Sequence, residues 1–335
     1  MKIVFAHFGN RLPKHLTLNI ERCKTLFPNI PIVLITNREC KVPRTAELEV
    51  SIYDTSSEWL QLDSDLSHPK DFRDNFWLTS VARFLAIKDY LANSPGEILH
   101  LESDVILSED FPFDRFSKLA KPIAFPILSS SQGIASTLYI RNYETAASLV
   151  SLTLEMASKD SKTTDMLVLR SFYKSYPEKT QLLPIGPLGK TAYRNFGDGT
   201  ILEEMTSAAL IFNGCFDGLD IGYYLFGVDP RNARGKKYLR KPLANSFLNV
   251  KETNIKYSSP RNFLNISSNL SEPEIPVFSL HIHSKNAHLF RVKKATKLFK
   301  VAVDNYLLPE SIEFVPRIFL HSIIQAVKRR LSKRK

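Results

Sequence analysis

Short apolar runs alternate with amphipathic segments along the first third of the chain. The runs have the length and composition of buried strands, and apolar side chains recur at helical spacing between them. We expect strands at residues 3–6, 32–36, 49–53, 98–101 and 105–107. We expect helices between Pro13 and Pro28 and over residues 76–91. Strands and helices in this alternation predict an α/β fold with a mostly parallel sheet covered on both faces.

The pattern loosens after these elements. Further strands are expected at residues 123–128, 137–140, 208–213 and 277–283, and further helices at 143–156, 165–173 and 287–306. Residues 54–75 are polar and acidic, and we expect them to form a loop. A last apolar stripe, from Leu320 to Leu331, has helical spacing and ends among basic residues.

The composition is that of an ordinary globular protein. The chain has 335 residues, of which 44% are apolar and 24% charged. No apolar run approaches the roughly 18–20 residues that span a bilayer, and the N-terminus becomes polar too soon for a signal peptide. Cys23, Cys40 and Cys215 are few and widely spaced, which argues against a disulfide framework and against a cysteine metal site. We therefore expect a cytoplasmic protein.

The net charge of +11 is concentrated near the C-terminus. Residues 284–335 carry 13 Lys/Arg and 3 Asp/Glu, so the rest of the chain is almost neutral. A nucleic-acid-binding protein usually spreads basic residues over its body, so we expect no nucleic acid partner. An apolar stripe with a basic end is typical of a helix that lies on anionic lipid. Residues 301–335 are therefore expected to form a basic amphipathic tail on the cytoplasmic face of a membrane; packing on the body is the alternative.

Two carboxylates stand at the end of the strand at 98–101. Residues 97–107 read Glu-Ile-Leu-His-Leu-Glu-Ser-Asp-Val-Ile-Leu, which places Glu102 and Asp104 one residue apart. Positions i and i+2 of a strand face the same side, so the two carboxylates are expected to converge. Such a pair beside an apolar core is costly unless a hard cation binds it. In parallel sheets ligands bind beyond the carboxyl ends of the strands, and the sequence predicts a Mg²⁺ or Mn²⁺ site there; a solvated strand end is the alternative.

Four features in order make the chain similar to a known family: the first strand with its loop, the helix that carries Arg83, the acidic triplet, and the late run His281-Ile-His-Ser-Lys285. In these four features the chain resembles the nucleotide-sugar-dependent glycosyltransferases of the GT-A fold that build bacterial capsule and lipopolysaccharide. The resemblance implies a Rossmann-like GT-A catalytic domain over residues 1–300, followed by the helical tail. It implies transfer of a sugar from a nucleotide-sugar donor, expected to be a UDP-sugar, to a glycan or lipid-linked acceptor in cell-surface polysaccharide synthesis.

The resemblance also implies roles for single residues. Asp104 is expected to bind the metal, and Glu102, which replaces the usual first Asp of the motif, to touch the ribose or the metal. His283 is expected as a further metal ligand, with His281 second, and Lys285 is expected at the β-phosphate. The remaining donor contacts are expected from Ala6, His7, Phe8, Arg83 and Ser103.

For Arg83 and Asp165 the sequence leaves two possible roles each. Arg83 is expected near the nucleotide or pyrophosphate, or else in a salt bridge beneath the site. Asp165 resembles an acidic residue beside the donor and acceptor sugars and would be the base of an inverting enzyme; a helix-capping Asp is the alternative. The late His/Lys arrangement favours a retaining enzyme. Asp217, Asp220 and Asp229 lie in a Gly-rich stretch, and we expect them either to line the acceptor pocket or to make turns.

Two other function classes fit parts of this pattern. A sugar nucleotidyltransferase would share the sheet and the metal carboxylates, but it normally begins with a Gly-rich phosphate loop, and residues 7–11 are poor in glycine. A non-catalytic, membrane-associated scaffold on the same fold would bind a nucleotide sugar without turning it over. The resemblance favours the glycosyltransferase over both.

Overall fold

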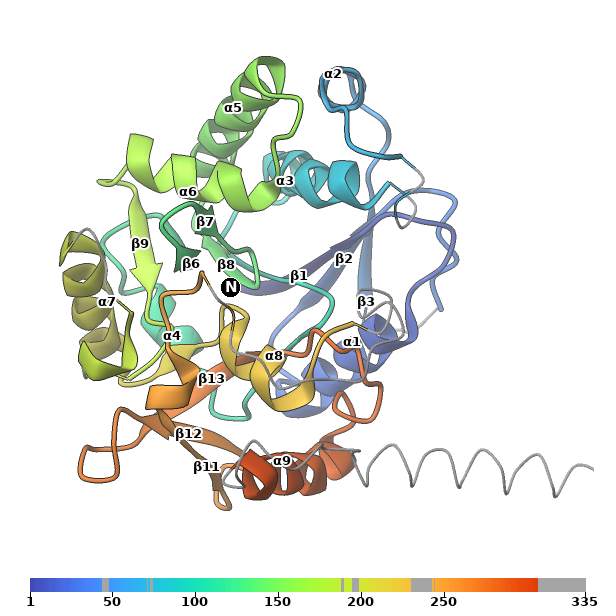
Figure 1. Cartoon of the computed structure of the whole chain (residues 1–335). Coiled ribbons are helices and arrows are strands. Elements are labelled where there is room, and N and C mark those ends of the chain that lie inside the picture. Colours follow the sequence, from blue (N-terminus) through green and yellow to red (C-terminus); the bar gives the residue numbers. More distant parts are fainter. Residues whose placement is uncertain are drawn as a thin grey trace, which may run out of the picture.

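The computed structural model describes residues 1–43, 48–70, 72, 75–187, 190–194, 199–229, 243 and 245–306. Within them a sheet of eight strands forms the centre of the molecule (Figure 1). Its strands are β1 (Lys2–His7), β2 (Ile32–Thr36), β3 (Leu48–Ile52), β4 (Ile98–Leu101), β6 (Ile123–Ser129), β7 (Gln132–Gly133), β8 (Thr137–Ile140) and β9 (Thr180–Leu183). They lie in the order β3-β2-β1-β4-β8-β6-β7, and β9 pairs with β6.

The strand directions agree with the expected sheet. The four strands from β3 to β4 run parallel to one another, and β6 runs parallel to β9. Two strands are exceptions: β8 is antiparallel to both β4 and β6, and β7 is antiparallel to β6. The carboxyl ends of β1 and β4 consequently lie at one edge of the sheet, where the loop after β1 and the acidic triplet begin.

A second sheet of five strands lies beside the first. It consists of β5 (Val105–Leu107), β10 (Cys215–Phe216), β11 (Asn254–Ser258), β12 (Phe263–Ser267) and β13 (Ile275–His281). The chain passes from β4 in the first sheet to β5 in the second through residues 102–104. Because β5 pairs antiparallel with β13, with Val105 opposite His281, the acidic triplet meets the end of β13.

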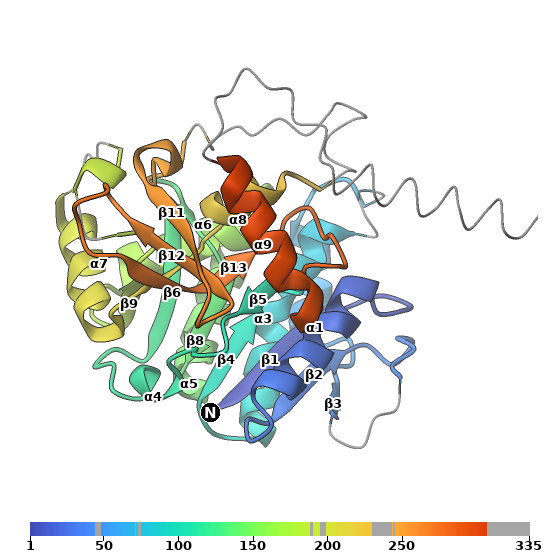
Figure 2. The ribbon, with the colours of Figure 1, turned by 90° about the horizontal axis from the view of Figure 1, so that it is seen from below.

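The helices cover both faces of the central sheet. They are α1 (Lys14–Leu26), α2 (Ser57–Asp65), α3 (Phe76–Asn93), α4 (Phe113–Phe116), α5 (Tyr143–Lys159), α6 (Asp165–Ser175), α7 (Gly199–Phe212), α8 (Asp220–Phe226) and α9 (Val292–Tyr306), with short 3-10 turns at Lys190–Ala192 and Val250–Glu252. In Figure 1, α3, α5 and α6 lie on one side of the sheet, and α1, α8 and the second sheet lie on the other. Seen from below, α9 lies in front of the rest of the molecule, with one end close to α1 (Figure 2).

The central strands are apolar along their whole length because both of their faces are buried. On β1, Val4 joins the core on the side of α3, whereas Ile3 and Phe5 join a separate core with Leu16 and Ile20 of α1. All five side chains are at most 5% exposed. This two-sided burial keeps the edge with the acidic triplet in a fixed position.

Two expectations about secondary structure were wrong. Residues 54–75 are not only loop, because α2 forms there: the Ser56 side chain caps its first turn, and Leu62 is completely buried. Residues 208–213 are not a strand but belong largely to α7. Its buried positions Ile201, Met205, Ala208 and Phe212 recur at helical spacing, whereas Leu210 and Ile211 are exposed. The window of 208–213 is too short to reveal that period.

The expected tail falls mostly on residues 307–335, which lie outside the described residues. Its first residues belong to α9, which spans residue 301 and packs on the second sheet through Phe299, Ala302 and Val303. No helix in the described part of the chain is both long and apolar enough to span a membrane.

Candidate active site

The acidic triplet is a turn between two sheets. Residues 102–104 leave the strand after Leu101, and the Val105 backbone N–H donates to the Glu102 carbonyl oxygen at 3.0 Å. The convergence of the carboxylates therefore comes from this turn and not, as expected, from strand alternation. Helix α1 supports the turn: Asn19 Nδ2 donates to the Val105 carbonyl oxygen at 2.6 Å, and His15 Nε2 hydrogen-bonds Ser103 Oγ at 3.1 Å.

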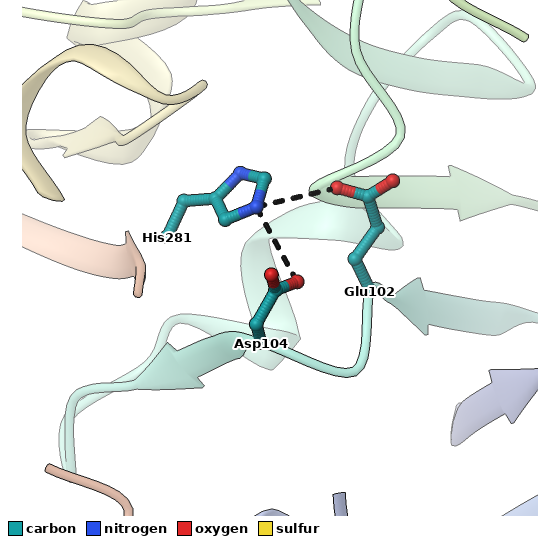
Figure 3. Close-up of side chains that lie close together, drawn as sticks. All are labelled: Glu102, Asp104 and His281. Atoms are coloured by element: carbon teal, nitrogen blue, oxygen red, sulfur yellow. Dashed lines mark ion pairs between the residues drawn. The ribbon is translucent and has the colours of Figure 1, made fainter. Parts of the chain in front are cut away.

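Three side chains meet at this turn (Figure 3). One ligand atom from each of Glu102, Asp104 and His281 lies within 4.8 Å of the other two. His281 Nε2 is 3.3 Å from Asp104 Oδ1 and 3.7 Å from Glu102 Oε2. Carboxylate oxygens suit Mg²⁺ and Mn²⁺, and imidazole nitrogen is a common ligand of transition metals. This donor set, which we call the metal cluster, therefore fits a divalent cation such as Mn²⁺.

The electrostatics of the metal cluster are dominated by opposite charges at short range. Burial disfavours the Asp104 carboxylate, but His281 and Lys285 outweigh it and hold the pKa of Asp104 well below its usual range. Burial also disfavours a charged imidazole, yet Asp104 and Glu102 raise the pKa of His281 to about 9. The carboxylates and the protonated imidazole therefore compensate one another, and a cation that binds here has to displace the His281 proton.

The imidazole of His283 lies outside the metal cluster. Strand β13 ends at His281, so the two histidines do not share a strand face, and their ring centroids are 6.2 Å apart. His283 Nδ1 accepts the backbone N–H of Asp229 at 3.0 Å. Burial lowers the pKa of His283 to about 4, which keeps this ring neutral. Of the two expected histidine ligands, the structure brings the second choice, His281, to the carboxylates.

Lys285 brings a positive charge to the rim of the metal cluster. Its Nζ lies 3.6 Å from Asp104 Oδ2 and 3.8 Å from Asp229 Oδ2. The backbone of Lys285 has φ +53°, a left-handed conformation that is unfavourable for a residue with a Cβ. Backbone strain of this kind is concentrated at functional sites, where the surrounding structure enforces it. An ammonium held beside a metal cluster is well placed to pair with a phosphate.

Arg83 and Asp165 form an ion-pair network behind Glu102. Arg83 Nη1 lies 2.8 Å from Glu102 Oε1, and Nη2 lies 2.8 Å from Asp165 Oδ2. Arg83 Nε donates to the Ser80 carbonyl oxygen, so each guanidinium nitrogen has a partner in the protein. Burial raises the pKa of Asp165, with Glu102 acting in the same direction and Arg83 opposing both. This geometry corresponds to the second role considered for Arg83, a salt bridge beneath the site.

The loop after β1 lies at the same edge as the metal cluster. Ala6 and His7 end β1, and His7 Nε2 donates to the Arg11 carbonyl oxygen at 3.1 Å. Burial lowers the pKa of His7, and the nearby charge of Lys285 lowers it further. The Phe8 ring packs edge-on against Trp59, with 5.2 Å between the centroids. The segment expected to contact the donor is thus fixed beside the cluster by packing.

Several residues that hold this site were not predicted in this role from the sequence, although Asp217 was considered for the acceptor pocket or a turn. Asn19 and His15 support the triplet from α1, and Asp217 and Gly218 hydrogen-bond His281. No spacing relative to the acidic triplet indicates them, because each contacts residues far away in the chain, and only His15 does so without a backbone atom. An Asp followed by Gly was the available signal at 217–218, and it also fits an ordinary turn.

Comparisons with known proteins give distant matches only. No family model and no curated protein matches the chain. Among solved structures, similar ones include galactosyltransferase LgtC in complex with donor and acceptor sugar analogs, at 12% identity and a TM-score of 0.43 over 62% of this chain and 83% of that one. An active-site mutant of LgtC gives 13% identity and 0.42 over the same shares. Mouse xyloside xylosyltransferase 1 gives 9% and 0.34 over 61% of this chain and 93% of that one.

Each of these neighbours is a glycosyltransferase by name. Their sequence identities and TM-scores are too low to carry ligands or reactions over to this chain. Its function therefore rests on the residues of the site itself.

Proposed function

We propose that this protein is a metal-dependent glycosyltransferase that moves a sugar from a nucleotide-sugar donor, a UDP-sugar by preference, to a glycan or lipid-linked acceptor. One observation carries the proposal: Glu102, Asp104 and His281 converge within 4.8 Å at the carboxyl edge of parallel strands, with Lys285 beside them. This edge is where α/β sheets bind their ligands. A site that combines clustered metal ligands with a separate ammonium is suited to a diphosphate.

Glycosyl transfer from a nucleotide sugar needs stabilisation of the departing nucleoside diphosphate and correct positioning of the two substrates. Glu102, Asp104 and His281 would hold the cation, which supplies positive charge for the diphosphate when bound. Lys285 adds a second positive charge from the other side of Asp104. Arg83 fixes the orientation of Glu102 through a buried ion pair.

The ion pair of Asp165 with Arg83 favours retention of the configuration of the donor sugar over its inversion. An inverting enzyme needs a carboxylate base at the acceptor hydroxyl. Asp165, the residue expected in that role, is 6% exposed and its carboxylate is paired with Arg83. We therefore assign Asp165 to the support of Arg83, and we propose that transfer retains the configuration of the donor sugar.

The proposed cellular setting is cell-surface polysaccharide synthesis at the cytoplasmic face of a membrane. Arg291, Lys294, Lys297 and Lys300 are exposed on or just before α9, and residues 328–335 add further basic side chains. Basic surfaces of this kind are attracted to anionic lipid. An enzyme held there would meet lipid-linked acceptors.

The test is hydrolysis of a panel of nucleotide sugars with and without Mn²⁺. The wild type is expected to release nucleoside diphosphate slowly from one donor, only with the metal. Asp104→Asn should abolish the release, and Asp114→Asn, which changes a carboxylate on the exposed surface of α4, should leave it unchanged. A nucleotidyltransferase would instead release pyrophosphate from a nucleoside triphosphate and a sugar phosphate. Donor binding without any product would indicate the scaffold, and absence of donor binding would overturn the proposal.

A further inference from the structure

His281 is held in place by residues 217–222, which we call the 217–222 segment. The Asp217 carboxylate is completely buried and accepts the backbone N–H of His281 at 3.0 Å. The same carboxylate accepts the N–H groups of Ile221 and Gly222 at 2.9 and 2.8 Å, where α8 begins. One side chain thus ties the N-terminus of α8 to the residue that supplies the imidazole of the metal cluster.

The imidazole ring is oriented by the same segment. His281 Nδ1 lies 2.9 Å from the carbonyl oxygen of Gly218. Because a carbonyl oxygen only accepts, Nδ1 carries a proton, and Nε2 is the atom that faces Asp104 and Glu102 (Figure 3). A hydrogen bond to the distal nitrogen fixes both the tautomer and the orientation of a metal-binding histidine.

Helix α8 approaches β13 closely because residue 222 is glycine. A Cβ at Gly222 would lie 1.9 Å from the His281 carbonyl oxygen and 2.9 Å from Asp217 Oδ2. Any side chain there would have to push α8 away from the end of β13. The contact that lets Asp217 reach both α8 and His281 therefore depends on the missing side chain.

Helix capping accounts for only part of this arrangement. The bonds to Ile221 and Gly222 satisfy free N–H groups of the first turn of α8. The bond to His281 crosses to a strand of the second sheet and has no part in capping. Asp217 is itself anchored to that region, since its backbone N–H donates to the Ser279 carbonyl oxygen and its carbonyl oxygen accepts from Ser136 Oγ.

We propose that Asp217 is a positioning residue for the metal cluster, which it serves by fixing the backbone of His281 while Gly218 orients the ring and Gly222 permits the contact. The inference rests on the proposed function, because it takes the metal cluster to bind a divalent cation. It predicts that cation affinity depends on a carboxylate that does not itself contact the cation.

The experiment is a calorimetric titration with Mn²⁺, combined with thermal unfolding of each metal-free variant. Asp217→Asn and Gly222→Ala should each lower the Mn²⁺ affinity by about 10- to 100-fold, the usual effect of losing an outer support of a metal ligand. Ile221→Ala is the matched control, because it weakens packing of the same helix but leaves the acceptor of the His281 N–H in place. It should lower the unfolding temperature and retain wild-type Mn²⁺ affinity.

The outcomes separate this inference from the proposed function. Wild-type affinity in Asp217→Asn, or an equal loss in Ile221→Ala, would overturn the positioning role while the metal site stands. No Mn²⁺ binding by the wild type would overturn both. A further measurement needs no variant: ¹⁵N-histidine NMR of the wild type with Mg²⁺ should show a proton on His281 Nδ1, whatever the state of Nε2. A His281 without a proton on Nδ1 would contradict the proposed orientation.

Discussion

At the scale of single residues, Arg83 holds two buried carboxylates with one guanidinium. The side chains of Arg83, Glu102 and Asp165 are 11%, 16% and 8% exposed. Removing one partner of a buried ion pair leaves an uncompensated charge and costs about 3–5 kcal/mol. We expect Arg83→Met to lower the free energy of unfolding by that amount, measured by urea denaturation.

An exposed ion pair provides the control for this variant. Arg38 and Asp54 lie 3.0 Å apart, with side chains 75% and 66% exposed. Such pairs contribute about 0–1 kcal/mol, so Arg38→Met should change stability little. Adding Asp165→Asn to Arg83→Met should recover part of the loss, because one unpaired charge is then removed. Equal stability of Arg83→Met and Arg38→Met would contradict the network.

Asp220 gives the protein a pH-dependent stability. Burial raises the pKa of Asp220 to about 8, and its Oδ2 accepts a hydrogen bond from Ser246 Oγ at 2.6 Å. The folded state therefore keeps a proton between pH 4 and 8 that the unfolded state releases near its ordinary pKa. Stability should fall as the pH rises through this range, and the loss should be complete above pH 8.

The variant Asp220→Asn tests this dependence. It keeps the acceptor for Ser246 but cannot ionise, so it should unfold at a higher temperature than the wild type at pH 8.5. The difference should be clearly smaller at pH 5 and should vanish below pH 4. Integrating the linkage from pH 5 to pH 8.5 gives a change of about 4 kcal/mol in the difference between the free energies of unfolding of the two proteins. Asp304→Asn, on the exposed side of α9, should show no such difference. Parallel pH profiles of wild type and Asp220→Asn would contradict the assignment.

Which residues could be predicted from the sequence depends on how they reach the site. Glu102, Asp104 and Lys285 were identified because their order along the chain resembles a known pattern, and the structure brings them together. The choice between His281 and His283 was not decided by spacing, because it depends on where β13 ends. Asp217 was named only as a residue of the acceptor pocket or of a turn, because its contact with His281 uses a backbone N–H that no sequence pattern records.

At the scale of elements, six of the eight strands of the first sheet and the helices α1, α3, α5 and α6 were predicted closely, because buried apolar runs leave a clear signature. Strands β7 and β9 were not predicted. Helix α2 was not predicted because its segment is polar. Since only Leu62 of this helix is buried, no apolar stripe marks it in the sequence. Helix α7 was predicted as a strand because five adjacent apolar residues resemble one until the longer period from Ile201 to Phe212 is considered. The β4–β5 turn could not be predicted, since pairing of β5 with a distant strand decides it.

The start of α2 gives a prediction at this scale. Ser56 Oγ accepts the backbone N–H of Trp59 at 3.2 Å and hydrogen-bonds Tyr53 Oη at 2.8 Å. Loss of such a cap costs about 1 kcal/mol. Ser56→Ala should destabilise the protein by this amount and increase amide exchange in α2. Ser57→Ala, at an exposed neighbouring position, is the control and should do neither. Unchanged exchange in Ser56→Ala would show that α2 does not depend on this cap.

At the scale of the whole molecule, positive charge is gathered at the C-terminal side of a nearly neutral body. If this charge holds the protein on anionic lipid, vesicles that contain phosphatidylserine should sediment the wild type at low salt. Binding should weaken as salt is added, because screening acts within about 10 Å at 0.1 M. Truncation after residue 306, combined with Lys294→Glu and Lys297→Glu, should abolish binding to these vesicles. Equal binding to neutral vesicles, or binding that ignores salt, would contradict an electrostatic attachment.

Considered as a whole, the site is proposed to be the metal centre of a sugar-transferring enzyme, formed together by Glu102, Asp104 and His281. The most direct measurement compares two histidine variants in Mn²⁺-dependent release of nucleoside diphosphate from the preferred donor. His281→Gln removes a ligand and should abolish both the release and the Mn²⁺ affinity, whereas His283→Gln changes a neighbouring ring outside the metal cluster and should retain Mn²⁺ affinity. Full Mn²⁺-dependent release of nucleoside diphosphate by His281→Gln would contradict a metal centre that includes His281.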